Sequence, residues 1–206
     1  PAARNILQPL TDADLSHEAF GFGTTQTIDI GYALVEAIRL TYVGELGWEL
    51  YVPTEFARHV YEQVVESGAE HGLVHAGFHA MNSLRCEKGY RHWGHDITPD
   101  DTPIEAGLSF AVAWEKAVNF RGRGALEAQR KVGATQRLVQ VKLQQQDDDE
   151  ARYLHHNEPL FRNGERVGYV TGGMWGHTVG AAIGMAIAIR GEKVDAAWIR
   201  DATWEV

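Results

Sequence analysis

The chain has 206 residues, of which 44% are hydrophobic, and a formal net charge of −9. This length and hydrophobic content suffice to bury a core as one large or two small domains, and the negative charge argues against a nucleic-acid partner while leaving room for a local basic site. Cys86 is the only cysteine, which excludes an intrachain disulfide and a thiolate metal cluster, and apolar stretches such as Ala181–Ile189 fall short of the roughly 20 residues that a membrane helix needs.

The start of the chain bears on its origin. It opens at Pro1 without an initiator methionine or a targeting leader, so we expect a piece of a longer protein. A single cysteine fits a reducing compartment, which predicts the cytoplasm, or the mitochondrial matrix in a eukaryote. No membrane partner is expected.

The first predicted elements are a hairpin and a helix. Residues 24–30 are rich in β-branched side chains, and Gly31 separates them from a second strand-like stretch at 33–40. The helix follows with Thr54 as its N-cap, apolar side chains four residues apart, and Gly72 at its end. We expect this helix to pack on the sheet.

Two further helices are predicted before the chain changes character. One covers residues 78–88 and stops at Gly89, just before a mixed aromatic and polar stretch where function often lies. The other covers residues 123–131. Beyond it, the composition changes at Gly133, where we expect a domain boundary.

The remainder of the chain has the pattern of β-structure. Apolar and polar side chains alternate with period two over residues 137–143, and Asn163-Gly164 is a strong signal for a hairpin turn. The acidic run at 144–150 is interpreted as a solvated loop rather than a calcium site, because carboxylates crowded in sequence repel one another. The fold class is therefore α+β, with an α+β domain at residues 1–133 and a small β-barrel or sandwich at residues 134–206.

Residues 42–50 hold the densest group of features for ligand binding. Gly44 and Gly47 permit backbone turns and close approach of a flat ligand, and Glu45 and Glu49 are nearby carboxylates. A carboxylate can accept paired hydrogen bonds from an aminopyrimidine edge, which a pterin carries. The alternative is a tight turn with exposed glutamates.

Five sequence blocks stand out in order along the chain. They are YVGELGWE at 42–49, NSLRCEKGY at 82–90, GHDI at 94–97, TPIEAGL at 102–108 and GYVTGG at 168–173. In this order they resemble the aminomethyltransferase (glycine-cleavage T-protein) family, and the resemblance extends back to the first residue. The EKGYRHWG form at 87–94 looks most like the folate domains of sarcosine and dimethylglycine dehydrogenases or oxidases.

This resemblance implies part of an aminomethyltransferase folate-binding domain, followed by the family's C-terminal β-barrel domain, around a tetrahydrofolate channel. It implies that Glu49 holds the pterin and that Tyr42 contacts it. The family's catalytic aspartate belongs to a region upstream of Pro1, so no catalytic residue is carried over and the isolated chain is expected to be inactive. Met81 stands where glycine-cleavage T-proteins carry an arginine for the folate tail, which favours the dehydrogenase-like relatives.

Basic residues near the second block suggest a place for the folate tail. Arg85, Lys88 and Arg91 would form a strip if they share one helix face, and Arg85 is our candidate folate contact. The alternative is a solvated charged face balanced by Glu87.

The histidines that follow are not expected to bind a metal, since His92 and His95 lack a convincing ligand spacing. Asp96 has the chemistry of a general base, but the resemblance implies that its stretch supports the channel.

The leading functional hypothesis is a one-carbon transfer module that traps an oxidised methyl carbon as 5,10-methylene-tetrahydrofolate. Its substrate would be a small N-methyl amine or imine, and FAD would belong only to a missing upstream domain of the parent. Catalysis of this kind relies mainly on positioning. Two alternatives stay open: a non-catalytic folate-binding or regulatory domain, and a folate-dependent demethylase.

Overall fold

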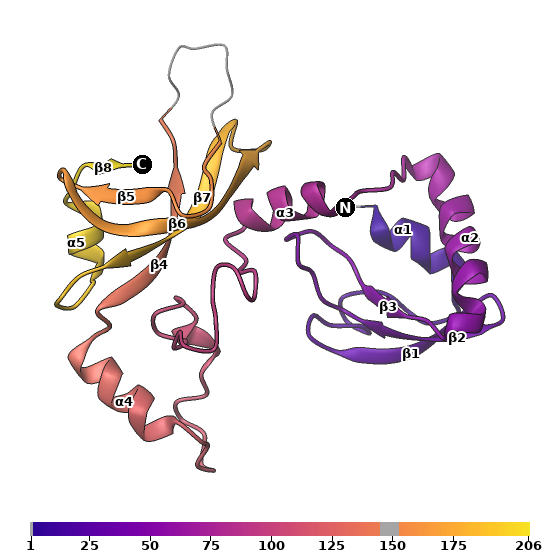
Figure 1. The fold of residues 1–206 in the computed structure, drawn as a ribbon. Helices are drawn as coiled ribbons and strands as arrows, with labels where there is room; N and C mark the ends of the chain where they lie inside the picture. The colour runs from indigo at the N-terminus through magenta and orange to yellow at the C-terminus, as the bar shows by residue number, and fades with distance from the viewer. Residues whose placement is uncertain (1, 145–152) are drawn as a thin grey trace. The chain divides into compact units, whose positions relative to one another are not determined.

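The computed structural model describes residues 2–144 and 153–206 and divides into two compact units, Pro1–Met81 and Asn82–Val206 (Figure 1). Helices and strands occur in both units, so the predicted α+β class is confirmed. The domain boundary that we expect between residues 133 and 134 stays a prediction. Among the described residues, no helix combines the length and the apolar character that crossing a membrane requires.

Unit 1, Pro1–Met81, is built on an antiparallel sheet of order β1-β2-β3. Strands β1 (Thr25–Ile30) and β2 (Ala33–Ile38) form the predicted hairpin, and β3 (Glu49–Tyr51) pairs with β2 after a ten-residue connection at 39–48. Gly31 has a φ of 59° in the tight turn of the hairpin, a conformation that favours glycine.

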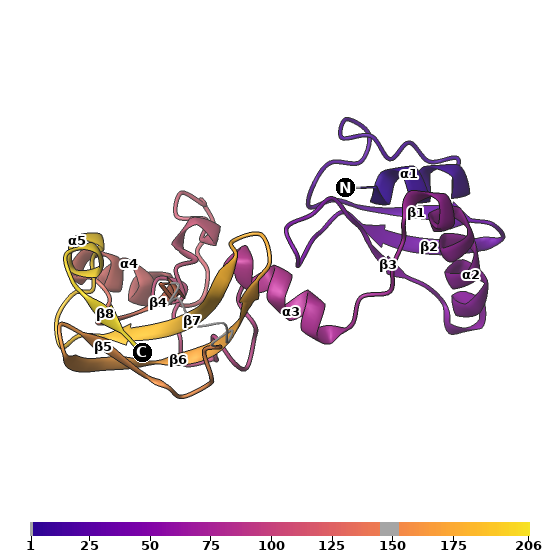
Figure 2. The ribbon, with the colours of Figure 1, turned by 90° about the horizontal axis from the view of Figure 1, so that it is seen from above.

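The helices of unit 1 lie before and after the sheet in the chain (Figure 2). They are α1 (Ala3–Leu7), η1 (Gln8–Leu10), η2 (Thr54–Phe56), α2 (Ala57–Gly68) and η3 (Ala69–His71). The predicted role of Thr54 as a helix cap is wrong, because a 3-10 turn begins there and its N-cap is Pro53 without a side-chain hydrogen bond. Gly72, with a φ of 70°, ends the helical segment as expected.

The core of unit 1 lies on one face of the sheet. Alternate β2 residues Ala33, Val35 and Ala37 are buried there with Phe20 and Val60. Period-two alternation places Leu34, Glu36 and Tyr51 on the other face of the sheet, where they are exposed among the described residues of unit 1. We call this the outer face.

Unit 2, Asn82–Val206, is dominated by a five-stranded antiparallel sheet of order β4-β7-β6-β5-β8. The strands are β4 (Gln136–Lys142), β5 (Pro159–Arg162), β6 (Glu165–Gly176), β7 (Ala181–Ile189) and β8 (Trp204–Glu205). This half-barrel confirms the β-structure predicted for this part of the chain. The acidic run at 144–150 lies outside the described residues, apart from Gln144.

The helices of unit 2 precede the sheet in the chain, except that the last of them lies between strands β7 and β8. They are α3 (Phe78–Glu87), which starts within unit 1, η4 (Ser109–Ala111), α4 (Arg123–Val132) and α5 (Ala196–Arg200). Both predicted helices at 78–88 and 123–131 are confirmed. The predicted hairpin turn is confirmed as well, since Asn163 and Gly164 have φ values of 51° and 81° between β5 and β6.

Close backbone packing between β6 and β7 requires glycine at 168. A Cβ on Gly168 would lie 1.8 Å from the carbonyl oxygen of Ile187, which belongs to the backbone of the neighbouring strand. Such a clash cannot be relieved by rotating a side chain.

We therefore expect Gly168→Ala to destabilise the protein by about 1–3 kcal/mol or more, because overpacking against a fixed backbone forces the strands apart. Thermal unfolding measures this change. Gly191→Ala is the control, since Gly191 has no atom within 4 Å of the added carbon and lacks a positive φ. Equal melting temperatures for the two variants would contradict the close approach.

Candidate functional site

The connection between β2 and β3 is held by its own hydrogen bonds. The hydroxyl oxygen of Thr41 accepts the backbone N–H groups of Val43 and Glu45, each at 3.2 Å. Gly44 lies within this turn and has a φ of 75°, where a side chain would be strained. Tyr42 lies within this turn and is half-buried. The sequence thus places Tyr42 in an ordered bend close to the edge of the sheet.

Glu49 is the first residue of β3 and is exposed. It pairs with Ile38 across the sheet, and its Oε2 accepts a hydrogen bond of 3.2 Å from the phenol of Tyr51. This hydrogen bond raises the pKa of Tyr51, and the charges of Glu49 and then Glu36 raise it further. A carboxylate offers about four acceptor sites, so Glu49 keeps capacity for a ligand with paired donors.

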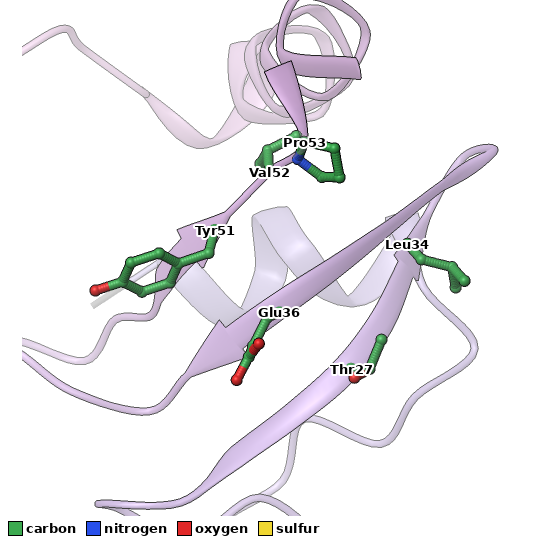
Figure 3. A pocket seen from close by; sticks show the side chains of 6 residues that line it. All are labelled: Thr27, Leu34, Glu36, Tyr51, Val52 and Pro53. Atoms are coloured by element: carbon green, nitrogen blue, oxygen red, sulfur yellow. The ribbon is translucent and has the colours of Figure 1, made fainter. Parts of the chain in front are cut away.

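A shallow hollow of about 440 Å³ lies on the outer face of the sheet (Figure 3). Its lining comprises Thr27, Leu34, Glu36, Tyr51, Val52 and Pro53. The pairing register places Thr27, Glu36 and Tyr51 in one row across the three strands. Tyr51 therefore links the hollow to Glu49. We did not predict Glu36 or Tyr51 as site residues, although period-two alternation in β2 would have assigned Glu36 to this face.

Arg85, the third predicted site residue, belongs to unit 2 and is only 3% exposed. Its Nε donates to the side-chain oxygen of Asn82 at 2.6 Å and its Nη1 donates to the carbonyl of Tyr90 at 3.1 Å. Nη1 also forms an ion pair with Asp96. The alternative of a solvated charged face required Arg85 at the surface, and in this respect it is wrong, whereas Arg85 as a folate contact stays a prediction.

Only Lys88 of the three predicted basic residues is exposed. Helix α3 ends at Glu87 and Gly89 has a φ of 65°, so Arg91 does not continue the helical face. The guanidinium of Arg91 instead donates to the carbonyls of Gly89 at 2.6 Å and Ala106 at 2.9 Å. A continuous strip of three cations is therefore not formed.

The carboxylate of Asp96 accepts hydrogen bonds from three separate segments, and the residue is only 1% exposed. Besides the ion pair with Arg85, it accepts the backbone N–H of His92 at 2.9 Å and the hydroxyl of Thr171 at 2.6 Å. These contacts join α3, the turn at 92–97 and β6. Asp96 therefore supports the fold of unit 2 and is too buried to meet a substrate.

The carboxylate of Glu87 ties the end of α3 to the turn between β6 and β7. It accepts the N–H groups of Thr178 at 2.6 Å and Val179 at 3.1 Å, and the hydroxyl of Thr178 at 3.1 Å. Partial burial raises the pKa of Glu87, but these donors outweigh it, so the pKa lies below its usual value. Glu87 thus anchors the turn and does not balance a basic strip.

The two histidines of the turn lie close together. The rings of His92 and His95 have centroids 4.3 Å apart, and burial lowers the pKa of His92, with the charges of His95 and Arg85 adding to the effect. Within the described ranges, no group of three His, Cys, Asp or Glu side chains has the arrangement of a metal site.

Comparison with known proteins relates both parts of the chain to one family. Residues 1–116 match the family model described as GCVT N-terminal domain, and residues 136–206 match the glycine cleavage T-protein C-terminal barrel domain. The solved structure of glycine cleavage system aminomethyltransferase T from Bartonella henselae superimposes with a TM-score of 0.64 at 31% identity, covering 75% of this chain and 42% of that chain.

Two curated relatives extend the comparison. The chain is 48% identical over 183 residues to mitochondrial sarcosine dehydrogenase of Mus musculus, covering 89% of this chain and 19% of that protein. It is 38% identical over 186 residues to mitochondrial dimethylglycine dehydrogenase of Homo sapiens, covering 90% of this chain and 21% of that protein. The chain thus spans about a fifth of the length of these relatives.

The Asp96 network yields a stability prediction. Asp96→Asn should destabilise the protein by about 3–5 kcal/mol, because it leaves the buried guanidinium of Arg85 without a counter-charge. Chemical denaturation measures the free energy of unfolding. Asp100→Asn is the matched control, since Asp100 is exposed. A loss below about 0.5 kcal/mol for Asp96→Asn would contradict a supporting role.

The anchoring role of Glu87 predicts a pH dependence. Because the pKa of Glu87 is lowered in the folded protein, its contribution is present above the unfolded-state pKa of about 4.3 and is lost as pH falls through the folded pKa. Melting temperatures between about pH 3 and pH 6 should therefore rise less steeply for Glu87→Gln than for the wild type. Parallel curves would show that Glu87 does not anchor the turn.

Proposed function

Because the chain belongs to the GCVT N-terminal domain family and ends in the T-protein barrel domain, we propose that it is a tetrahydrofolate-binding module for one-carbon transfer. The family resemblance carried by the five sequence blocks is confirmed. The proposal adds to it a ligand, tetrahydrofolate, and a role within a longer protein that oxidises a small N-methyl amine.

The observation that carries the proposal is the placement of Glu49. Its carboxylate is exposed at the edge of an uncovered sheet face and accepts one hydrogen bond, from Tyr51. The aminopyrimidine edge of a pterin presents two adjacent N–H donors, which a carboxylate receives in a bidentate arrangement. Tyr42, in the bend preceding β3, would contact the pterin ring. These two side chains fit the folate in chemical type.

The part played by this chain is binding and orientation. Tetrahydrofolate, when bound, supplies a nucleophilic nitrogen that takes up the one-carbon unit. Glu49 would fix the pterin by its polar edge, and positioning of this kind raises the effective concentration of the reacting groups. Arg85 is a weaker candidate folate contact, because its guanidinium is occupied by Asn82, Tyr90 and Asp96. The catalytic aspartate would come from outside the chain.

The wider setting of the module follows from its relatives. Two of them are sarcosine and dimethylglycine dehydrogenases, of which the chain matches about a fifth. A flavin region elsewhere in the parent protein would oxidise the N-methyl amine, and this module would receive the resulting imine carbon. A eukaryotic parent would work in the mitochondrial matrix, a bacterial one in the cytoplasm.

Glu49→Gln in the full-length protein should raise the Kd for tetrahydrofolate by about 10-fold to 100-fold. The amide of glutamine keeps the shape of the side chain, but its NH2 group is a hydrogen-bond donor and would face one of the two donors of the pterin. Isothermal titration calorimetry gives the Kd, and the melting temperature reports on the fold.

Glu55→Gln is the matched control, because Glu55 is another exposed glutamate of unit 1. It should leave the Kd unchanged. Tyr51→Phe should have an intermediate effect, since it removes the phenol that orients Glu49. Equal affinities of Glu49→Gln and wild type would remove Glu49 from the site and with it the main support for folate binding.

A further inference from the structure

Among the described residues of unit 1, three buried groups that can only donate a hydrogen bond have no acceptor. They are Nε of Arg39, Nη2 of Arg4 and the indole Nε1 of Trp48. Buried polar groups are nearly always hydrogen-bonded, so each such group calls for an explanation. All three can only donate, because a guanidinium and an indole N–H have no acceptor. The missing partner must therefore be rich in acceptors.

Arg39 occupies a core position. It directly follows β2 and continues the buried series of Ala33, Val35 and Ala37, so that only 5% of its surface is exposed. Its backbone is fixed by hydrogen bonds to Thr24 and Gly23, each of 2.9 Å. The guanidinium carbon lies 4.8 Å from the centre of the Trp48 ring. This stacking uses the face of the guanidinium and leaves its buried Nε–H group without an acceptor.

Arg4 places a second positive charge near Arg39. It lies in α1, and its Nε donates to the carbonyl of Leu15 at 2.8 Å while Nη2 stays without a partner. Burial lowers the pKa of Arg39, and the charge of Arg4 lowers it further. The nearby carboxylate of Asp14 accepts the N–H of Ser16 at 2.8 Å, and among the described residues neither arginine forms an ion pair.

We infer that Arg39, Arg4 and Trp48 form a binding site for a carboxylate. A carboxylate is planar, carries two acceptor oxygens and pairs with arginine through charge-assisted hydrogen bonds. It would satisfy unpaired donors and relieve the repulsion of two like charges. Arg4 is only half-buried, which leaves an approach from solvent. The site is separate from the proposed folate site, because Arg39 belongs to the core side of β2 and Glu49 lies on the outer face.

The carboxylate has two possible sources with the same chemistry. One is a free small acid, and the other is an aspartate or glutamate side chain from a segment beyond these 206 residues. The second source is physically reasonable because the chain covers only 42% of the aminomethyltransferase T structure that it matches. A carboxylate from either source would accept hydrogen bonds from the unpaired donors of Arg39, Arg4 and Trp48.

Nuclear magnetic resonance of the 15N-labelled chain tests the site through its own donors. Sodium acetate replaces sodium chloride at constant ionic strength, and the Nε–H signal of Arg39 and the indole signal of Trp48 are followed. Both protons should move downfield along one saturable curve, because a hydrogen bond to a carboxylate deshields them. The indole signal of Trp198, in unit 2, should stay in place. Signals are assigned with Arg39→Lys and Trp48→Phe.

Variants decide whether the two arginines act together. Arg4→Met, at a half-buried position, should weaken acetate binding at least 10-fold, and Arg58→Met, at an exposed arginine of α2, should leave it unchanged. Arg39→Lys keeps the charge but loses the planar fork, so it should also weaken binding. Responses that are identical in acetate and chloride, or unaffected by Arg4→Met in a folded chain, would overturn the proposal.

A crystal structure of the full-length protein separates the two sources. An Asp or Glu side chain within hydrogen-bonding distance of Arg39 identifies a carboxylate of the same protein, and a bound free acid identifies a ligand. Carbonyl oxygens alone around Arg39 and Arg4 would overturn the proposal.

Discussion

The buried carboxylate of Asp96 holds together the part of unit 2 that carries the second and third sequence blocks. A carboxylate at 1% exposure is stable only if donors replace the water that it loses, and Arg85, His92 and Thr171 supply them. These donors come from a helix, a turn and a strand, so one side chain fixes three segments. The constraint also limits function, because a guanidinium that neutralises a buried aspartate cannot serve a ligand without breaking the network.

The two faces of the sheet in unit 1 carry different kinds of hydrogen-bonding groups. Its outer face presents acceptors, the carboxylates of Glu36 and Glu49, while its inner side holds the unpaired donors of Arg39 and Trp48. This separation follows from the period-two alternation of β-strands. A donor-rich aminopyrimidine matches the outer face and a carboxylate matches the inner side. The proposed folate site and the proposed carboxylate site are thus chemically opposite and do not compete.

Local patterns predicted most elements, because hairpins and helix stops depend on nearby residues. Asn163-Gly164 fixed its turn through positive φ values, and Gly89 ended α3 in the same way. The environment of Arg85 could not be predicted, since its partner Asp96 is also held by Thr171, which is 75 residues further along the chain and reaches Asp96 only in the folded protein. Spacing alone suggested an exposed basic strip. Glu49 was predicted by resemblance, whereas Tyr51 and Glu36 became visible through the pairing register of β1, β2 and β3.

In the proposed folate site, the carboxylate of Glu49 receives the pterin of tetrahydrofolate. The most direct measurement is a crystal structure of the full-length protein with a stable reduced folate bound. We expect the amino group and the adjacent ring N–H of the pterin both to lie within hydrogen-bonding distance of the Glu49 carboxylate, with Tyr42 against the ring. A folate bound elsewhere, with Glu49 surrounded by water, would contradict it.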